Sequence, residues 1–109
     1  MSFAPKLVLE ITDGGLRWQP GPRADATVSV DPARVPQGTV VDIANRTGSD
    51  RRVVGDDGKA FDTGTLRPGE TTTLALTTPI TAEQTVTVRT RGGPDASTAL
   101  VVVPRPAER

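Results

Sequence analysis

The chain has 109 residues, 13 basic and 13 acidic side chains, and neither cysteine nor histidine. This length fits a single domain. The missing residue types exclude disulfides and the Ser–His or Cys–His pairs of nucleophilic catalysis. A net charge of zero argues against a nucleic-acid partner, because a protein that binds nucleic acid needs a surplus of positive charge.

Segments in which apolar and polar residues alternate recur along the chain, as in half-buried β-strands. The first segment, 6–11, places Leu7, Leu9 and Ile11 on one face. The last, 98–103, is apolar on both faces, so we expect it in a more protected position. The alternating segments between them are 26–30, 41–43, 71–76 and 85–89.

Turn-forming residues separate these segments, and 11 glycines and 10 prolines leave no room for a long helix. The run 13–15, Asp-Gly-Gly, predicts a hairpin between Ile11 and Leu16. We therefore predict an all-β fold, a two-sheet antiparallel β-sandwich of seven or eight strands. We expect one domain over residues 1–103, followed by a disordered tail or linker at 104–109.

Three stretches between about residues 28 and 103 carry a family resemblance. Segment 31–45 runs through a proline-bearing link and Gly38 into an apolar strand, then reaches Asn45. Segment 63–74 passes through Leu-Arg-Pro-Gly-Glu into a threonine-rich strand, and segment 85–103 holds a strand, a loop and a final apolar strand. This order resembles the cupredoxin-like fold, which implies a Greek-key sandwich. An immunoglobulin-like sandwich is the alternative, because the same corner sequence occurs there.

The residues at the expected copper site differ from those of that family. A blue-copper centre needs two imidazoles and a thiolate. Arg51 and Arg52 occupy the place of one histidine, the loop 89–97 holds no copper ligand, and the sole methionine is Met1. The resemblance therefore implies a copper-free relative, with no metal site and no cofactor.

The same topology would bring the turn 46–52 and the loop 89–97 to one end of the sandwich. Five arginines would then surround the place of the copper: Arg46, Arg51, Arg52, Arg89 and Arg91. Such a cluster could hold a small anion or an acidic partner surface. The alternative is a solvated end, partly neutralised by the neighbouring carboxylates Asp50, Asp56 and Asp95.

Two smaller features each have two interpretations. Asp56, Asp57 and Asp62 could form a calcium loop, but their spacing does not match an EF-hand and favours a hairpin turn around Gly58. Trp18 could be an exposed stacking platform, although core packing with a partner for its indole N–H is favoured.

We predict no catalytic residues and interpret the chain as a non-catalytic interaction module. It would engage a protein partner or a second copy through an end loop or a strand edge. The alternatives are an anion-binding domain that uses the arginine-rich end, and an enzyme of unrecognised type. Neither a signal-peptide pattern nor a membrane-spanning apolar run is present. We therefore expect a cytoplasmic protein if the chain is complete, and an extracytoplasmic one if it is an excised domain.

Overall fold

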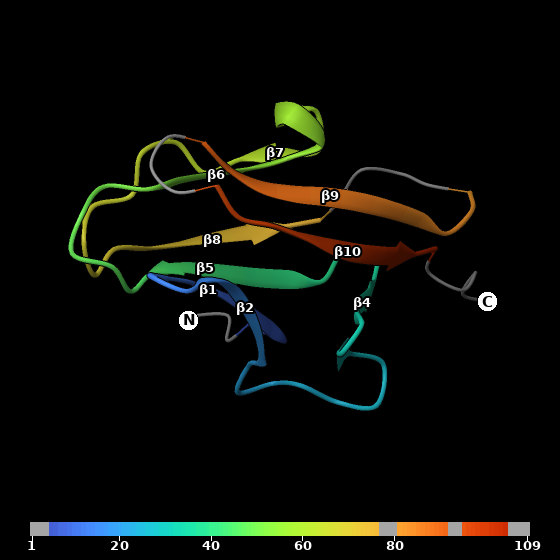
Figure 1. Ribbon diagram of the computed structural model, residues 1–109. Helices are drawn as coiled ribbons and strands as arrows, with labels where there is room; N and C mark the ends of the chain where they lie inside the picture. Colours follow the sequence, from blue (N-terminus) through green and yellow to red (C-terminus); the bar gives the residue numbers. More distant parts are fainter. Residues whose placement is uncertain (1–4, 77–80, 92–94, 105–109) are drawn as a thin grey trace.

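The computed structural model describes residues 5–76, 81–91 and 95–104, which form two β-sheets packed together (Figure 1). The strands are β1 (Leu7–Thr12), β2 (Gly15–Pro20), β3 (Ser29–Val30), β4 (Ala33–Pro36), β5 (Val40–Asn45), β6 (Arg52–Gly55), β7 (Phe61–Asp62), β8 (Thr71–Ala75), β9 (Gln84–Arg91) and β10 (Ser97–Val103). A single 3₁₀ turn, η1 (Asp56–Gly58), lies between β6 and β7. Within these residues no helix is long and apolar enough to cross a membrane. The prediction of an all-β fold is confirmed; the tail from residue 105 onward lies outside the described residues.

Both sheets are mixed, so the prediction of purely antiparallel sheets is wrong. The smaller sheet has the order β2-β1-β5-β8, and the larger has the order β3-β4-β10-β9-β6-β7. β1 runs parallel to β5, and β4 runs parallel to β10. An alternating sequence specifies which side chains face the core, but it carries no information on the direction of the neighbouring strand.

The described part of the chain contains ten strands, so the expected count of seven or eight is not confirmed. Eight of these strands have at least four residues, and β3 and β7 have only two. β4 lies in the proline-bearing link and shows very little alternation. Its buried residues are Ala33 and Val35, and the residue after each of them is exposed or half-exposed. Such short segments are stabilised by neighbouring strands rather than by a pattern of their own.

The core lies between the sheets and is almost entirely aliphatic. The inward residues of β1 are all buried, as the alternation predicted, and so are Val86 and Val88 of β9. β10 lies between β4 and β9, which confirms the protected position expected for the last apolar segment. Trp18 packs against the core, and its Nε1 donates to Thr98 Oγ1 of the other sheet at 3.0 Å, which confirms its core interpretation.

Candidate functional site

Three of the five arginines lie on the outer face of the larger sheet. Arg52 of β6 and Arg91 of β9 are register partners, and Arg89 is paired in register with Val54. The register pair between them, Val53 and Thr90, is buried and faces the core. Because side chains alternate along a strand, Arg52, Arg89 and Arg91 share the opposite, solvent side.

The other two arginines have different surroundings. Arg51 lines a crevice of about 330 Å³ at the end of the sandwich, between the β1–β2 turn and residues 95–97. Asp13 and Asp95 line the same crevice, so carboxylates accompany this guanidinium. Arg46 lies beside β1, with its Nε 3.2 Å from Glu10 Oε2. Arg51 of the turn and residues 95–97 of the loop lie together at this crevice, but the five side chains do not share one site.

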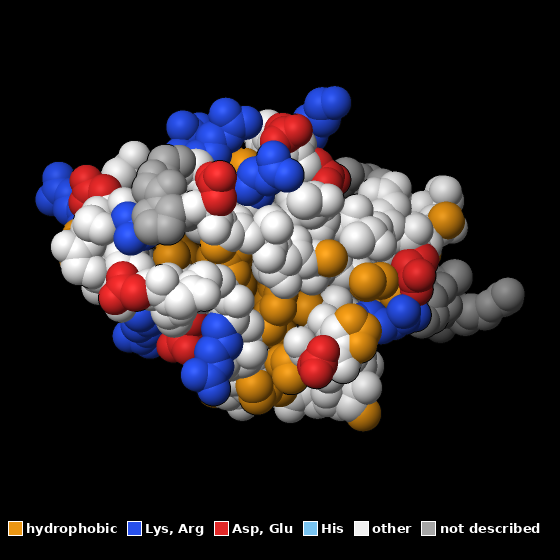
Figure 2. All heavy atoms as spheres, in the orientation of Figure 1, with side chains coloured by type: hydrophobic (Ala, Val, Ile, Leu, Met, Phe, Trp, Pro, Cys, Tyr) orange, Lys and Arg blue, Asp and Glu red, His pale blue; other side chains and the backbone are white. Residues whose placement is uncertain are grey.

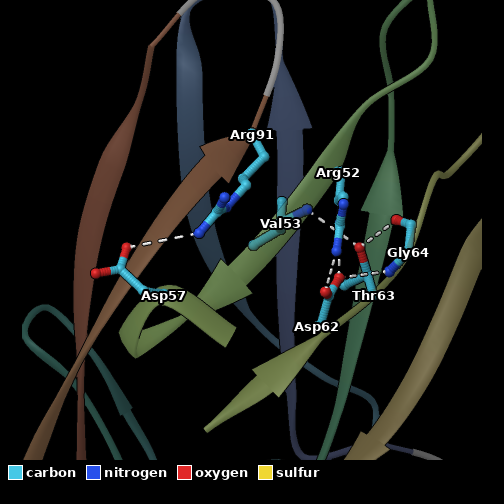
Figure 3. Close-up of polar contacts among 7 residues, drawn as sticks. All are labelled: Arg52, Val53, Asp57, Asp62, Thr63, Gly64 and Arg91. Atoms are coloured by element: carbon cyan, nitrogen blue, oxygen red, sulfur yellow. Dashed lines mark hydrogen bonds and ion pairs between the residues drawn. The ribbon is translucent and has the colours of Figure 1, made fainter. Parts of the chain in front are cut away.

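Two arginines of the outer face, Arg52 and Arg91, each lie beside a carboxylate (Figure 3). Arg52 donates through Nε to Asp62 Oδ1 at 2.8 Å, and its Nη2 contacts Asp62 Oδ2. Arg91 Nη2 lies 4.0 Å from Asp57 Oδ1. Figure 2 likewise shows Lys and Arg side chains next to Asp and Glu side chains. Opposite charges at these distances offset each other, so Arg52 and Arg91 add little net positive charge to this face.

The three aspartates do not converge on a common point. Asp56 Oδ1 accepts a hydrogen bond from the Thr87 N–H at 2.9 Å, whereas Asp57 and Asp62 contact Arg91 and Arg52. Across the described residues, no group of three His, Cys, Asp or Glu side chains could hold a metal ion. The segment is a polar turn in which Asp57, at φ 56°, adopts the left-handed backbone that aspartate tolerates better than most residues.

The Arg52–Asp62 pair makes stability depend on pH. The hydrogen bond from Arg52, followed by one from the Gly64 N–H, holds the pKa of Asp62 well below its usual range. The resulting stabilisation is complete above the unfolded-state pKa of about 3.9 and is lost as pH falls toward the lower folded-state value. We expect Asp62→Asn to lower the Tm at about pH 7, and the difference from wild type to narrow below about pH 4. Thermal unfolding followed by circular dichroism from about pH 7 to about pH 2 measures this.

Asp57→Asn is the matched control for this prediction. Its ion pair with Arg91 spans 4.0 Å, and both side chains are more than half exposed. Such a pair contributes little, so the Tm should stay close to wild type at every pH. A Tm difference for Asp62→Asn that stays constant down to about pH 2 would show that lost geometry, and not lost charge, causes the effect.

A further surface feature, the free edge of β8, was not identified by sequence reasoning. In the described part of the chain β8 has a strand neighbour, β5, on one side only. The three other sheet edges differ from it: β3 and β7 have two residues each, and β2 carries Arg17 and ends at Pro20. Brevity, charge and proline are the devices that protect sheet edges from pairing with other chains. β8 has five residues, Thr-Thr-Thr-Leu-Ala, and none of these devices.

The backbone pairing of β8 defines which of its polar groups face outward. The Asn45 N–H donates to Glu70 O at 2.9 Å, and the Leu76 N–H donates to Thr39 O at 3.1 Å. The direction of the main-chain hydrogen-bonding groups alternates along a strand. The N–H and C=O groups of residues 72 and 74 therefore point toward β5, as those of Glu70 and Leu76 do. The N–H and C=O groups of Thr71, Thr73 and Ala75 therefore point away from β5, and these residues are solvent-exposed.

An apolar groove adjoins this edge. It has a volume of about 480 Å³ and lies between β7 and β8. Most of its lining is apolar and includes Phe61, Leu74 and Leu76 with the core residues Val86 and Val102. Three charged residues, Asp56, Lys59 and Asp62, also line it. Hydrophobic side chains also reach the surface in a band across the face drawn in Figure 2. The signal in the sequence was the uncharged run 71–76, but only the sheet order shows that this run is an edge.

Comparison of the chain with protein-family models, with curated proteins and with solved structures found no match.

Proposed function

We propose that this chain is a non-catalytic interaction module, a copper-free cupredoxin-like domain that binds an extended segment of a protein partner along β8. The observation that carries the proposal is that β8 has a strand neighbour on one side only within the described residues, with outward main-chain groups at Thr71, Thr73 and Ala75. An added strand would hydrogen-bond to these groups and extend the smaller sheet, the binding mode known as β-augmentation.

The groove beside the edge supplies the specificity that main-chain bonds lack. In β-augmentation, side chains of the added strand alternate, and every second one reaches a pocket. The groove lined by Phe61, Leu74 and Leu76 is mostly apolar and lies next to β8. The preferred ligand is therefore an extended segment with an apolar residue at every second position.

The cupredoxin-like part of the proposal rests on the order of elements. The link, the apolar strand and the Asn45 turn correspond to β4, β5 and the loop after it. The proline–glycine corner precedes β8, and the final strand–loop–strand corresponds to β9 and β10. Anion binding by the arginines has less support, because Arg46, Arg52 and Arg91 each have a carboxylate partner.

A phage-displayed library of linear peptides tests the proposal. We expect the chain to enrich peptides with alternating apolar residues. Thr73→Pro should lower their affinity at least about tenfold, because it removes an outward N–H and adds a ring at the edge. The same substitution breaks no main-chain bond to β5, and proline is tolerated at strand edges. It does remove the side-chain bond from Thr73 Oγ1 to Asp42 Oδ1 of β5, and Thr73→Ala removes that bond too. Thr73→Ala keeps the N–H and should bind like wild type.

Hydrogen–deuterium exchange of the wild-type chain gives a second measurement that does not depend on a variant. A bound peptide should slow amide exchange at Thr71, Thr73 and Ala75, while Thr72 and Leu74, already bonded to β5, should change little. Failure to enrich any peptide, or protection confined to other strands, would overturn the proposal.

A further inference from the structure

The composition of β8 suits pairing with a second copy of itself. Two antiparallel copies related by a two-fold axis at Thr73 would place Thr73 opposite Thr73, and Thr71 opposite Ala75. The outward main-chain groups of all three residues would then face outward groups of the other copy. Cross-strand Thr–Thr pairs are favourable, and the same patch serves both copies in a two-fold interface.

Charge is compatible with this arrangement. β8 contains no charged residue, so two copies meet without opposing like charges. Glu70, directly before the strand, would lie across from Leu76 of the other copy in this register. The other edge long enough to pair, β2, differs because Arg17 would bring like charges together when two copies meet.

We propose that the chain forms a two-fold homodimer by antiparallel pairing of β8 with β8, centred on Thr73. This inference rests on the proposed function, since it names the second copy as an occupant of the same edge. The smaller sheets of the two copies join into one continuous sheet. A contact built on five residues per copy is small, so the dimer is weak, present at about 1 mM chain and absent at about 1 μM.

Opposite charges placed on the two-fold axis test the register. Thr73 Oγ1 donates to Asp42 Oδ1 at 2.6 Å, so Asp42→Asn is made first to remove the nearby charge. In this background we expect Thr73→Lys alone and Thr73→Glu alone to be monomeric, because each brings like charges face to face. An equimolar mixture of the two should dimerise again, because Lys then faces Glu.

Thr71→Lys in the same background is the matched control. Its charge would lie opposite Ala75 of the other copy, so dimerisation should weaken much less than with Thr73→Lys. Sedimentation velocity between about 1 μM and about 1 mM reads out the association state, and circular dichroism checks that each variant is folded. The Asp42→Asn chain alone should dimerise like wild type.

The outcomes separate this inference from the proposed function. A wild-type chain that is monomeric at about 1 mM yet still binds selected peptides overturns the dimer and leaves the interaction module in place. A dimer that is insensitive to Thr73→Lys, or a Lys and Glu mixture that stays monomeric, also overturns the pairing register. Dimerisation in the mixture of the Thr73→Lys and Thr73→Glu variants, but not in either variant alone, establishes the pairing register centred on Thr73.

Discussion

Replacing Asn45 with alanine is expected to lower the free energy of unfolding by about 3 kcal/mol. Asn45 ends β5 and is fully buried. Its Nδ2 donates to Leu66 O at 2.9 Å and to Ser49 O at 2.8 Å. Its Oδ1 accepts from the Thr47 N–H at 2.9 Å and from the Thr47 hydroxyl at 2.6 Å.

The physical reason is that the alanine variant would remove all four of these hydrogen bonds and leave the buried Thr47 N–H without its acceptor. Leu66 O would keep its bond from the Arg51 N–H, and the Thr47 hydroxyl would keep its bond to Ser49 O. Each unsatisfied buried group costs about 1–3 kcal/mol, more than the bond itself contributes. Ser49→Ala is the control, because the network uses only main-chain groups of that residue, and little change is expected. Urea denaturation measures the free energy of unfolding of both variants. A loss below about 1 kcal/mol would show that water replaces the amide.

The same residue positions the proposed binding edge. The Asn45 N–H donates to Glu70 O, and the Gly69 N–H donates to Asn45 O at 2.8 Å. Gly69 has a φ of 81°, a conformation that favours glycine in this turn. Alanine would keep these main-chain bonds but lose the bond from Asn45 Nδ2 to Leu66 O, which holds the chain just before the turn into β8. We therefore expect Asn45→Ala to weaken peptide binding at the edge as well as the fold.

Leu9→Ala is expected to lower the free energy of unfolding by about 2–5 kcal/mol. Leu9 is fully buried in β1, an interior strand of the smaller sheet, between its register partners Ile43 and Trp18. With only three aromatic residues in the chain, the core depends on aliphatic side chains such as this one. Truncation removes apolar contacts and leaves a cavity that strands held on both sides cannot close.

Val8→Ala is the matched control for Leu9→Ala. Val8 is the preceding residue of the same strand, but its side chain lies on the opposite face and is half-buried. The loss should therefore be smaller than for Leu9→Ala, about 1 kcal/mol. Urea denaturation measures the free energy of unfolding of both variants, and we expect their m-values to equal that of the wild type. Equal losses for the two variants would contradict the assignment of β1 faces.

The sequence by itself determined the local features of this protein. Period-two alternation identified Leu7, Leu9 and Ile11 as inward residues, and the Asp-Gly-Gly run predicted the β1–β2 hairpin. These properties depend on neighbouring residues only, because side-chain direction in a strand and turn geometry are set within a few residues. The absence of cysteine and histidine is likewise a property of composition.

Only the tertiary structure decided which strands are neighbours and in which direction they run. The parallel pair of β1 and β5, the edge position of β8 and the carboxylate partners of Arg46, Arg52 and Arg91 all depend on it. Each of these features depends on segments that are distant in the chain. An alternating pattern is the same whichever strand lies beside it, and whether that neighbour is parallel or antiparallel. The uncharged side chains of β8 are therefore determined by the sequence, but the position of β8 at a sheet edge follows from the path of the whole chain.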